Sequence, residues 1–466
     1  MSVAMPVRSS ESAFLSARGE LEGLFGERLS IARAVREQHA NTTTWVAGEP
    51  PDAVAFPRSE AEVQQSVRIC ARHRVPVIPF GAGTSFEGHV NAPMGGLCLD
   101  LRDMKRVLAV RAEDFDCTVE PGLTRGQLNE YLRDSGLFFP VDPGADASIG
   151  GMASTRASGT TAVRYGTMKD NVLALRVVLP SGEVMTTSRR ARKSSAGYDL
   201  TRLFVGAEGT LGVITELTLR LHGIPEAVSA GICPFPSVAA ACDTAIAAIQ
   251  SGMQISRIEL LDEVQIRVCN VHSRLGLPER PTLFVEFAGS EAGVAEQAER
   301  FGEIVADYAA EPFEWARDAD ERARLWRARH DVFWALRSYR PGASVVVTDV
   351  CVPISRLAEC VAETKRDIEA TGIIAPIVGH VGDGNFHASP LVMMNDPAEV
   401  ERAKAFVDRV AARALSMEGT CTGEHGIGEG KKHFMVEEHG AVAVEAMRAL
   451  KRTFDPLGIM NPGKIV

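Results

Sequence analysis

The sequence predicts an α+β protein built from more than one domain. The chain has 466 residues, more than one compact core organises, so two or three domains are expected. In the C-terminal half, strand and helix patterns alternate, and antiparallel returns between them indicate a sheet with helices on one face. A shift in composition at residues 223–226 predicts the boundary between two domains.

The first domain begins with a charged segment, residues 1–48, that is predicted to be helical. Between residues 61 and 73, apolar residues recur at helical spacing, and "VPVIPFGAG" follows as a strand that runs into a glycine loop. Turn residues separate further strands in "GGLCLDLRDM", "RVLAVRAEDFDCTVEPG" and "LALRVVLPSGEVMTT". The stretch "GYDLTRLFVGAEGTLGVITELTLRL" then predicts a helix, a glycine turn and a strand.

The second domain shows strands in "AGICPFP", "ISRIELLD" and "PTLFVEFAGS". Helices are predicted in "SVAAACDTAIAAIQSG", in "EAGVAEQAERFGEIVADYA" and over residues 355–371. No repeat of fixed period interrupts this order. The alternation places the predicted antiparallel sheet and its covering helices in this part of the chain.

Composition and charge exclude some classes of function. The 50 basic and 60 acidic residues give a net charge of −10, which argues against a nucleic-acid binder. Nine scattered cysteines, an odd number without a Cys-x-x-Cys pair, indicate neither a disulfide framework nor iron–sulfur ligands. We therefore expect a reducing cytoplasmic location, with peripheral attachment to a membrane left open. No signal peptide and no transmembrane segment are expected.

Three glycine-rich segments point to a ligand held by backbone. "PFGAGTSFEGHV" follows a strand, but it has neither Gly-x-Gly-x-x-Gly spacing nor a Walker Gly-Lys-Ser/Thr, so a phosphate nest and a structural turn both remain open. "DPGADASIGGMASTRASGTTAVRYGTMKDN" is either a flexible surface loop or a functional one. With "VGAEGTLGVIT", these segments suggest a cofactor surrounded by backbone.

These three segments resemble those of the vanillyl-alcohol oxidase and p-cresol methylhydroxylase flavoprotein family. The resemblance implies a two-part FAD-binding domain, with the FAD pyrophosphate on the first loop and the second loop around the flavin. Thr84, Ser85 and Phe86 stand where some members tether the flavin through a histidine, so non-covalent FAD is expected. The cofactor-binding residues that the resemblance implies are Pro79, Gly81, Ala82, Gly83, Thr84, Ser85, Gly88, Pro143, Ala147, Ser148, Gly150, Gly151, Ser154, Ser158, Gly159, Gly166, Glu208, Gly209, Gly212, Val213, Ile214 and Asn461.

Later motifs narrow the resemblance. "TDVCVPISRL", "GHVGDGNFH", "GTCTGEHGIGEGKK" and "LKRTFDPLGIMNPGKIV" resemble the group of D-lactate dehydrogenases, D-2-hydroxyglutarate dehydrogenases and glycolate oxidase flavin subunits. The likeness covers residues 45–466 and is strongest to the cytochrome-type D-lactate dehydrogenase branch. It implies a helical segment at 1–48, an FAD-binding domain at 49–224, a substrate domain with a metal site at 225–440, and a segment at 441–466 that returns to the FAD domain.

The stretch "GHVGDGNFHAS" places His380 and His387 on either side of a tight turn. A hairpin through residues 382–385 would bring them onto facing strands, where a metal site, a base or ordinary packing could each use them. Imidazole suits zinc, manganese or iron, and "TGEHGIG" offers Glu424 as a third ligand. The resemblance implies that His380, His387 and Glu424 bind one divalent metal, zinc or manganese.

The remaining site residues follow from the chemistry of a 2-hydroxy acid. Its hydroxyl must lose a proton as hydride leaves carbon 2, and His425 matches the family's catalytic histidine, with a metal-ligand or spacer role as the alternative. An arginine suits the substrate carboxylate. Arg329 matches the family's arginine, although Arg327, Arg337 and Arg340 lie nearby, and Asn385 is predicted as a second substrate-binding residue. Arg156 departs from the glycine that relatives tend to carry there.

The resulting hypothesis is an FAD-dependent, metal-assisted dehydrogenase that oxidises a D-2-hydroxy acid, D-lactate first. The alternatives are the flavin subunit of a glycolate oxidase complex, a D-2-hydroxyglutarate dehydrogenase, a carbohydrate-oxidising relative and an inactive flavin-binding relative. A cytochrome, quinone or electron-transfer flavoprotein is expected to accept the electrons. Whether the chain forms a homodimer is left open.

Overall fold

The protein divides into two compact units. The computed structural model describes residues 11–40, 45–308, 313–316 and 318–466. The first unit comprises residues 1–157, 167–223 and 424–466, and the second comprises residues 158–166 and 224–423. The division between residues 223 and 224 falls beside the predicted boundary at residue 224. The predictions for residues 1–10, 41–44 and 309 lie outside the described residues.

The C-terminal return to the first unit begins at Glu424, earlier than the predicted residue 441. Backbone hydrogen bonds explain the difference. The N–H of Glu429 donates to the carbonyl of Glu87 at 2.7 Å, and the carbonyl of Gly428 accepts from the N–H of Ile465 at 3.1 Å. Because these bonds tie the glycine-rich stretch after Glu424 to the first unit, that stretch belongs with it.

A small, largely parallel sheet opens the first unit. Its order is β1-β2-β4-β3, in which β2, β4 and β3 are parallel. Apolar residues of the helices α1 and α3 pack on it, and the Ser59 hydroxyl caps α3. The bounds are α1 Glu11–Phe25, β1 Leu29–Ser30, α2 Arg33–Gln38, β2 Ala53–Ala55, α3 Glu60–His73, β3 Val77–Phe80 and β4 Leu97–Asp100, with 3₁₀ turns at Gly26–Arg28 and Leu101–Asp103.

An antiparallel sheet completes the first unit, in the order β5-β6-β10-β8-β9. Its buried residues form a core with those of the short helices that lie between its strands in the chain. The bounds are β5 Val107–Arg111, β6 Asp116–Val119, α4 Arg125–Leu132, β7 Leu137–Phe138, α5 Ile149–Thr155, α7 Met168–Asn171, β8 Val172–Val178, β9 Val184–Thr186, α8 Leu200–Phe204, β10 Val213–Arg220 and β11 His222–Gly223, with 3₁₀ turns at Ala112–Asp114 and Arg133–Ser135.

The second glycine-rich segment is ordered into short helices rather than an irregular loop. Ser148 caps α5 by accepting from the N–H of Gly151, and Thr167 caps α7 with a reciprocal capping box. Between them, α6 (Ala162–Tyr165) belongs to the second unit. The interpretation as a flexible surface loop is therefore wrong.

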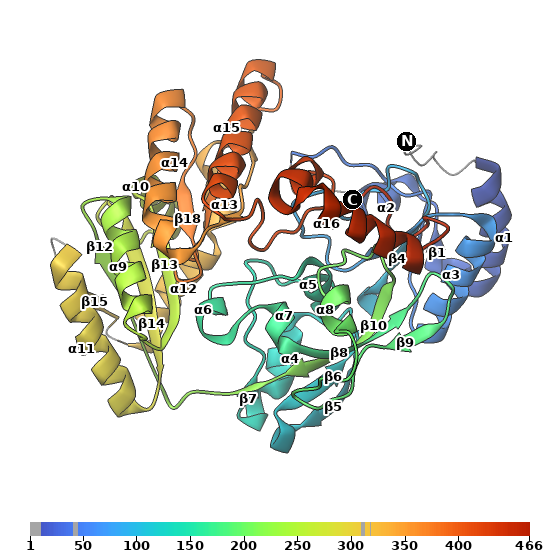
Figure 1. Ribbon diagram of the computed structural model, residues 1–466, viewed down its shortest axis with the longest axis horizontal. Coiled ribbons are helices and arrows are strands. Elements are labelled where there is room, and N and C mark those ends of the chain that lie inside the picture. Colours follow the sequence, from blue (N-terminus) through green and yellow to red (C-terminus); the bar gives the residue numbers. More distant parts are fainter. Residues whose placement is uncertain (1–10, 41–44, 309–312, 317) are drawn as a thin grey trace. The chain divides into compact units, whose positions relative to one another are not determined.

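The end of the chain joins the first sheet. Helix α16 (Met435–Phe454), drawn in red, lies among the blue and green elements of the first unit (Figure 1). After it, Met460 forms a parallel bridge with Val77 of β3, and the N–H of Asn461 donates to the Val77 carbonyl at 2.9 Å. These bonds place Asn461 beside the start of the first glycine loop. A 3₁₀ turn, Lys432–Phe434, precedes α16.

The second unit is built on a seven-stranded antiparallel sheet, as predicted. Its order is β15-β12-β14-β13-β18-β19-β17. A separate pair, β16 and β20, lies outside it. The bounds are β12 Ala227–Pro234, β13 Ile255–Leu261, β14 Thr282–Gly289, β15 Glu314–Trp315, β16 Ser344–Val345, β17 Val350–Cys351, β18 Ile377–Gly379, β19 Asn385–Ala388 and β20 Leu391–Val392.

Helices cover both faces of this sheet, whereas the sequence predicted helices on one face. Successive residues of β14 enter different cores, since Val285 packs in one apolar cluster and Phe284 in another. In Figure 1, α9 and α14 lie beside β13. The helices are α9 Val238–Gln250, α10 Glu263–Ser273, α11 Glu291–Tyr308, α12 Ala319–His330, α13 Val332–Tyr339, α14 Leu357–Thr371 and α15 Pro397–Ser416, with a 3₁₀ turn at Ile354–Arg356. Among the described residues, no helix combines the length and apolar character that a membrane span requires.

Candidate active site

The predicted hairpin is present, and its two histidines occupy different positions in it. His387 lies on β19 opposite Val378 of β18, whereas His380 follows the last residue of β18. The His380 carbonyl accepts from the N–H groups of Asp383 and Asn385, at 3.0 and 3.3 Å, so strand pairing ends there. The two imidazole rings nevertheless lie 5.6 Å apart, centroid to centroid.

Each imidazole uses Nδ1 for a hydrogen bond within the second unit. Nδ1 of His387 lies 2.9 Å from the carbonyl oxygen of Thr348, and because a carbonyl only accepts, Nδ1 carries the proton. Nδ1 of His380 lies 2.7 Å from the carboxylate of Glu259. In a neutral ring with a protonated Nδ1, Nε2 is the nitrogen that can bind a metal.

Asp349 lies beside this hairpin and was missed by the sequence analysis. Its carboxylate is buried, accepts from Nδ2 of Asn385 and from the hydroxyl of Thr422, both at 2.8 Å, and lies 3.7 Å from Nδ1 of His387. Nδ2 of Asn385 also donates to the Val350 carbonyl at 2.9 Å. The amide of Asn385, predicted to bind substrate, therefore orients Asp349.

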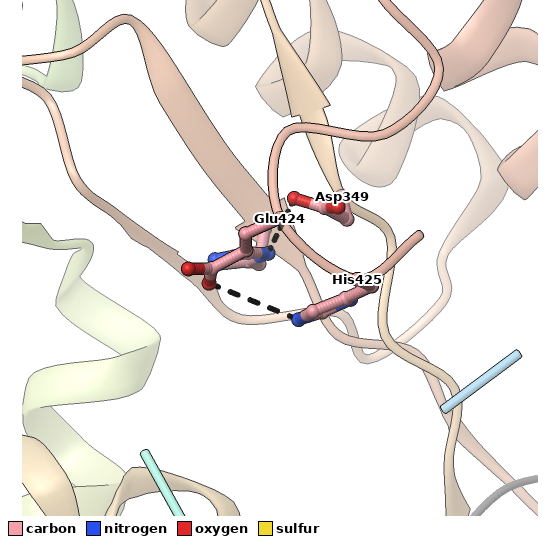
Figure 2. Close-up of side chains that lie close together, drawn as sticks. Asp349, Glu424 and His425 are labelled. Carbon is pink, nitrogen blue, oxygen red and sulfur yellow. Dashed lines mark ion pairs between the residues drawn. The ribbon is translucent and has the colours of Figure 1, made fainter. Parts of the chain in front are cut away.

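The same contacts bring Glu424 and His425 to the hairpin through the covalent chain. Thr422 is bonded to Asp349, and a Cβ on Gly423 would overlap the Asn385 amide, so the next residue begins at the hairpin. One ligand atom from each of Asp349, His387, Glu424 and His425 lies within 4.8 Å of the others. Figure 2 shows the side chains of Asp349, Glu424 and His425 lying close together. This group of four is the ligand cluster.

The ligand cluster overlaps the predicted metal ligands without matching them. His387 and Glu424 are members, His380 is not, and Asp349 and His425 are added. Imidazole nitrogens and carboxylate oxygens are the donors that zinc and manganese accept, so these residues fit a divalent ion. The metal-ligand alternative for His425 thus stands beside its predicted role as the base.

Arg329, the predicted carboxylate-binding arginine, lies near the end of α12 and is buried. Its Nε donates to Oε2 of Glu259 at 2.8 Å, and its Nη2 donates to the same oxygen. Of the neighbouring arginines, Arg327 is exposed and Arg340 pairs with Glu399. Arg329 is therefore the arginine of α12 whose side chain is buried.

In the first unit, the predicted cofactor segments converge. The Ser148 hydroxyl of the second segment lies where a Cβ on Gly81 of the first would sit. The N–H of Glu208, in the third, donates to the Ser154 carbonyl at 2.9 Å, and a Cβ on Gly209 would lie 3.0 Å from Pro79. These contacts require small residues and bring three distant segments of backbone together, as the sequence predicted. Ser158, Gly159 and Gly166 belong to the second unit.

Buried polar atoms lie where these segments meet. Nδ1 of His89 and Oδ1 of Asn461 have no hydrogen-bond partner among the described residues, whereas Nε2 of His89 lies 3.4 Å from Oε1 of Glu208. Nδ2 of Asn461 donates to the carbonyls of His89 and Glu208, at 3.0 and 2.7 Å. Since buried polar atoms are nearly always bonded, orphaned atoms here fit a polar cofactor such as FAD.

Glu208 holds the loop that follows His425. Its two carboxylate oxygens accept from the N–H groups of Ile427 and Gly428, at 2.7 and 2.9 Å. Burial raises the pKa of Glu208, but the neighbouring His89 and these N–H groups lower it by more, so its pKa lies below the usual range. The His425 ring lies 4.8 Å from that of Phe86 in the first glycine loop.

Arg156, which departs from the family pattern, has a structural role. It ends α5 in the left-handed region, with φ of 57°. Its Nε and Nη2 donate to the Val205 carbonyl at 3.3 and 3.2 Å. The cation therefore ties the second segment to the start of the third.

Two stretches of the chain match known families. Residues 224–465 match the family described as FAD linked oxidases, C-terminal domain, and residues 51–188 match the family described as FAD binding domain. The chain belongs to the FAD-linked oxidases. Membership confirms the flavoprotein resemblance and the FAD-binding domain that the glycine-rich segments predicted.

Two relatives of this FAD-linked oxidase align along nearly its whole length. "Probable D-lactate dehydrogenase, mitochondrial" of Danio rerio is 52% identical over 458 residues, covering 98% of this chain and 91% of the relative. "D-lactate dehydrogenase [cytochrome], mitochondrial" of Arabidopsis thaliana is 46% identical over 479 residues, covering 99% of this chain and 83% of the relative. These relatives confirm the predicted resemblance to the group that contains the D-lactate dehydrogenases.

A solved structure shares the fold. That of p-cresol methylhydroxylase with substrate bound has a TM-score of 0.83 to this FAD-linked oxidase at 18% identity, covering 99% of this chain and 98% of the other. At this identity the likeness concerns the fold. It confirms the predicted fold class, a two-part FAD-binding domain of the p-cresol methylhydroxylase type followed by a C-terminal α+β domain.

Proposed function

We propose that this FAD-linked oxidase oxidises a D-2-hydroxy acid, D-lactate first, to the 2-oxo acid with the help of a divalent metal. One observation carries the proposal: the ligand cluster joins His425 to imidazole and carboxylate donors in a chain 52% identical to a D-lactate dehydrogenase. FAD, when bound, supplies the acceptor for the hydride from carbon 2. A divalent ion, when bound, lowers the pKa of the substrate hydroxyl.

The protein's own residues divide the remaining work. The proposed metal ligands are His380, His387 and Glu424, and the His380 ring lies 5.6 Å from that of His387. Asp349 offers a further carboxylate. The His425 imidazole takes the hydroxyl proton, as its position beside Glu424 permits. The guanidinium of Arg329 binds the substrate carboxylate, and its burial strengthens that ion pair relative to one in water.

The electron acceptor and location are also proposed. The Arabidopsis relative is named as a cytochrome-type dehydrogenase, which favours a cytochrome as acceptor for this chain too. A reducing cytoplasmic location agrees with free thiols at all nine cysteines, eight of them buried. Membrane attachment through the acceptor is an extension of the same proposal.

The test is anaerobic reduction of the purified protein. The purified protein should be yellow because it binds FAD non-covalently. D-lactate should bleach this colour, whereas L-lactate should not. Glycolate and D-2-hydroxyglutarate, tried alongside, test the two alternatives from the same group. A chelator should slow bleaching, and added zinc or manganese should restore it. Failure to bind FAD, or equal bleaching by both lactate enantiomers, would refute the proposal.

A further inference from the structure

We propose that Glu259 is a positioning residue that holds the carboxylate-binding arginine and a metal-binding histidine with one carboxylate. The inference rests on the proposed function, in which Arg329 binds the substrate carboxylate and His380 belongs to the metal site. Glu259 was not among the residues that the sequence suggested. All three residues belong to the second unit, so the argument depends on that unit alone.

The strand register brings Glu259 to this place. It lies on β13, where Leu261, two residues later, packs in the same apolar cluster as Trp326 of α12. Because side chains two apart share a strand face, Glu259 faces α12, which carries Arg329. On neighbouring β18, Val378 packs in that cluster too, and His380 follows it by two residues. A charged residue inside a buried strand is thus directed at both partners.

The contact with Arg329 uses one edge of the guanidinium. Nε and Nη2 both donate to Oε2 of Glu259. Among the described residues, Nη1 of Arg329 has no hydrogen-bond partner. A guanidinium has five N–H groups in a planar fork, so the edge formed by Nη1 and Nη2 can still receive a carboxylate. Glu259 therefore fixes the plane of the fork and directs its other edge away from β13.

The contact with His380 uses the other carboxylate oxygen. Oε1 of Glu259 lies 2.7 Å from Nδ1 of His380, and Glu259 is fully buried. An ionised carboxylate only accepts, so it selects the tautomer with a proton on Nδ1 and leaves Nε2 as the metal-binding nitrogen. A carboxylate partner also makes that nitrogen a stronger ligand.

A purely structural ion pair would need only half of this arrangement. Neutralising the buried Arg329 requires a carboxylate, and Oε2 alone meets that need. The bond from Oε1 to His380 adds nothing to the neutralisation, yet it orients a residue of the proposed metal site. The experiment must therefore distinguish the joint orientation of Arg329 and His380 by Glu259 from a contribution of Glu259 to the stability of the fold alone.

The test substitutes Glu259→Gln in the FAD-loaded full-length protein. A carboxamide has one accepting oxygen and one donating nitrogen, so it cannot accept from both Arg329 and His380. We expect zinc or manganese affinity, measured without substrate by competition with a chromophoric chelator, to fall about 10- to 100-fold. The KM for D-lactate should rise as well, because the guanidinium loses its fixed plane.

The matched control is Glu286→Gln on neighbouring β14, a carboxylate of the same sheet that pairs with Arg257 at 3.7 Å. It should leave metal affinity and KM unchanged. Glu259→Asp keeps the negative charge and should restore part of the metal affinity and part of the KM. It replaces Glu259→Gln in the test if the glutamine variant does not fold. Unchanged metal affinity and KM in a folded Glu259→Gln protein would overturn only this inference. A wild type that binds no divalent ion would overturn the metal role in the proposed function together with it.

Discussion

Replacing Glu208 by glutamine should make the loop that follows His425, residues 426–428, open more often. Each carboxylate oxygen accepts one backbone N–H, from Ile427 and from Gly428. Glutamine keeps one oxygen and presents an NH₂ group in place of the other, so one of these N–H groups faces a donor. The substitution therefore removes a charge-assisted bond and leaves a buried donor unpaired.

The magnitude follows from those two losses. A hydrogen bond to a charged group contributes about 1.5–3 kcal/mol, and a buried unsatisfied group costs about 1–3 kcal/mol, so a net cost of about 2.5–6 kcal/mol is expected. Since about 1.4 kcal/mol is tenfold in an equilibrium constant, opening of this loop should become about 60- to 20,000-fold more frequent. Flavin reduction by D-lactate should slow by up to about 100-fold if His425 shifts by about 1 Å.

Amide hydrogen exchange measures the opening directly, in peptides that contain Ile427 and Gly428. The control is Glu120→Gln, another buried carboxylate of the first unit, which accepts from the backbone N–H and the guanidinium of Arg106. It should lower the melting temperature without changing exchange at residues 426–428. Wild-type exchange at these residues in Glu208→Gln would refute the assigned anchoring role.

The pH dependence gives a second measurement of the same anchor. The pKa of Glu208 in the folded protein lies below the ordinary value of 4.5. Its ionised form therefore contributes stability that is complete above pH 4.5 and is lost as the pH falls through the folded-state pKa. The difference in melting temperature between wild type and Glu208→Gln should narrow below pH 4.5. A difference that stays constant or widens there would contradict the sign of the pKa shift.

Three further substitutions test the site. His425→Ala should slow anaerobic flavin reduction by about 10²–10⁴-fold while FAD stays bound, and unchanged reduction would remove it as the base. His387→Ala should lower metal content, measured by atomic emission, together with activity, and full activity in metal-free protein would exclude a role for the ion. Gly426→Ala should lower the melting temperature, since Gly426 has φ of +79° and a Cβ would lie 2.7 Å from Glu208 Oε1 and His89 Nε2. Such backbone strain costs about 1–3 kcal/mol, and an unchanged melting temperature would show that the loop relaxes around the methyl group.

Periodicity in the sequence predicted most elements because their local signals agree. Helix α3 begins after the Ser59 cap, within one residue of the predicted start. Strands β13 and β14 lie in the predicted strands, and β12 overlaps its predicted strand but begins three residues earlier, at Ala227. The coverage of the second sheet was predicted incorrectly. The run "TLFVEFAG" of β14 is buried on both faces, and its nearly continuous apolar character, rather than strict alternation, is the signal for helices on two sides.

The site was predictable where its residues are near in sequence. His380 and His387 share one hairpin, and Glu424 and His425 are neighbours, so spacing and residue type drew attention to them. Glu259 was missed because its partners Arg329 and His380 lie 70 and 121 residues away. Sequence spacing carries no information about contacts that depend on the order of strands in a sheet.

The bonds of Asp349 explain why the hairpin and the Glu424 loop form one candidate site. Oδ1 accepts from Asn385, at the end of the turn, and Oδ2 accepts from Thr422, two residues before Glu424. Because a carboxylate oxygen has two lone pairs, an oxygen that accepts one hydrogen bond can also serve as a ligand atom. Because Asp349 joins the two stretches without an ion, His387→Ala should remove metal while the hairpin and loop keep their protection from hydrogen exchange. Loss of that protection along with the metal would show instead that the ion, and not Asp349, holds the two stretches together.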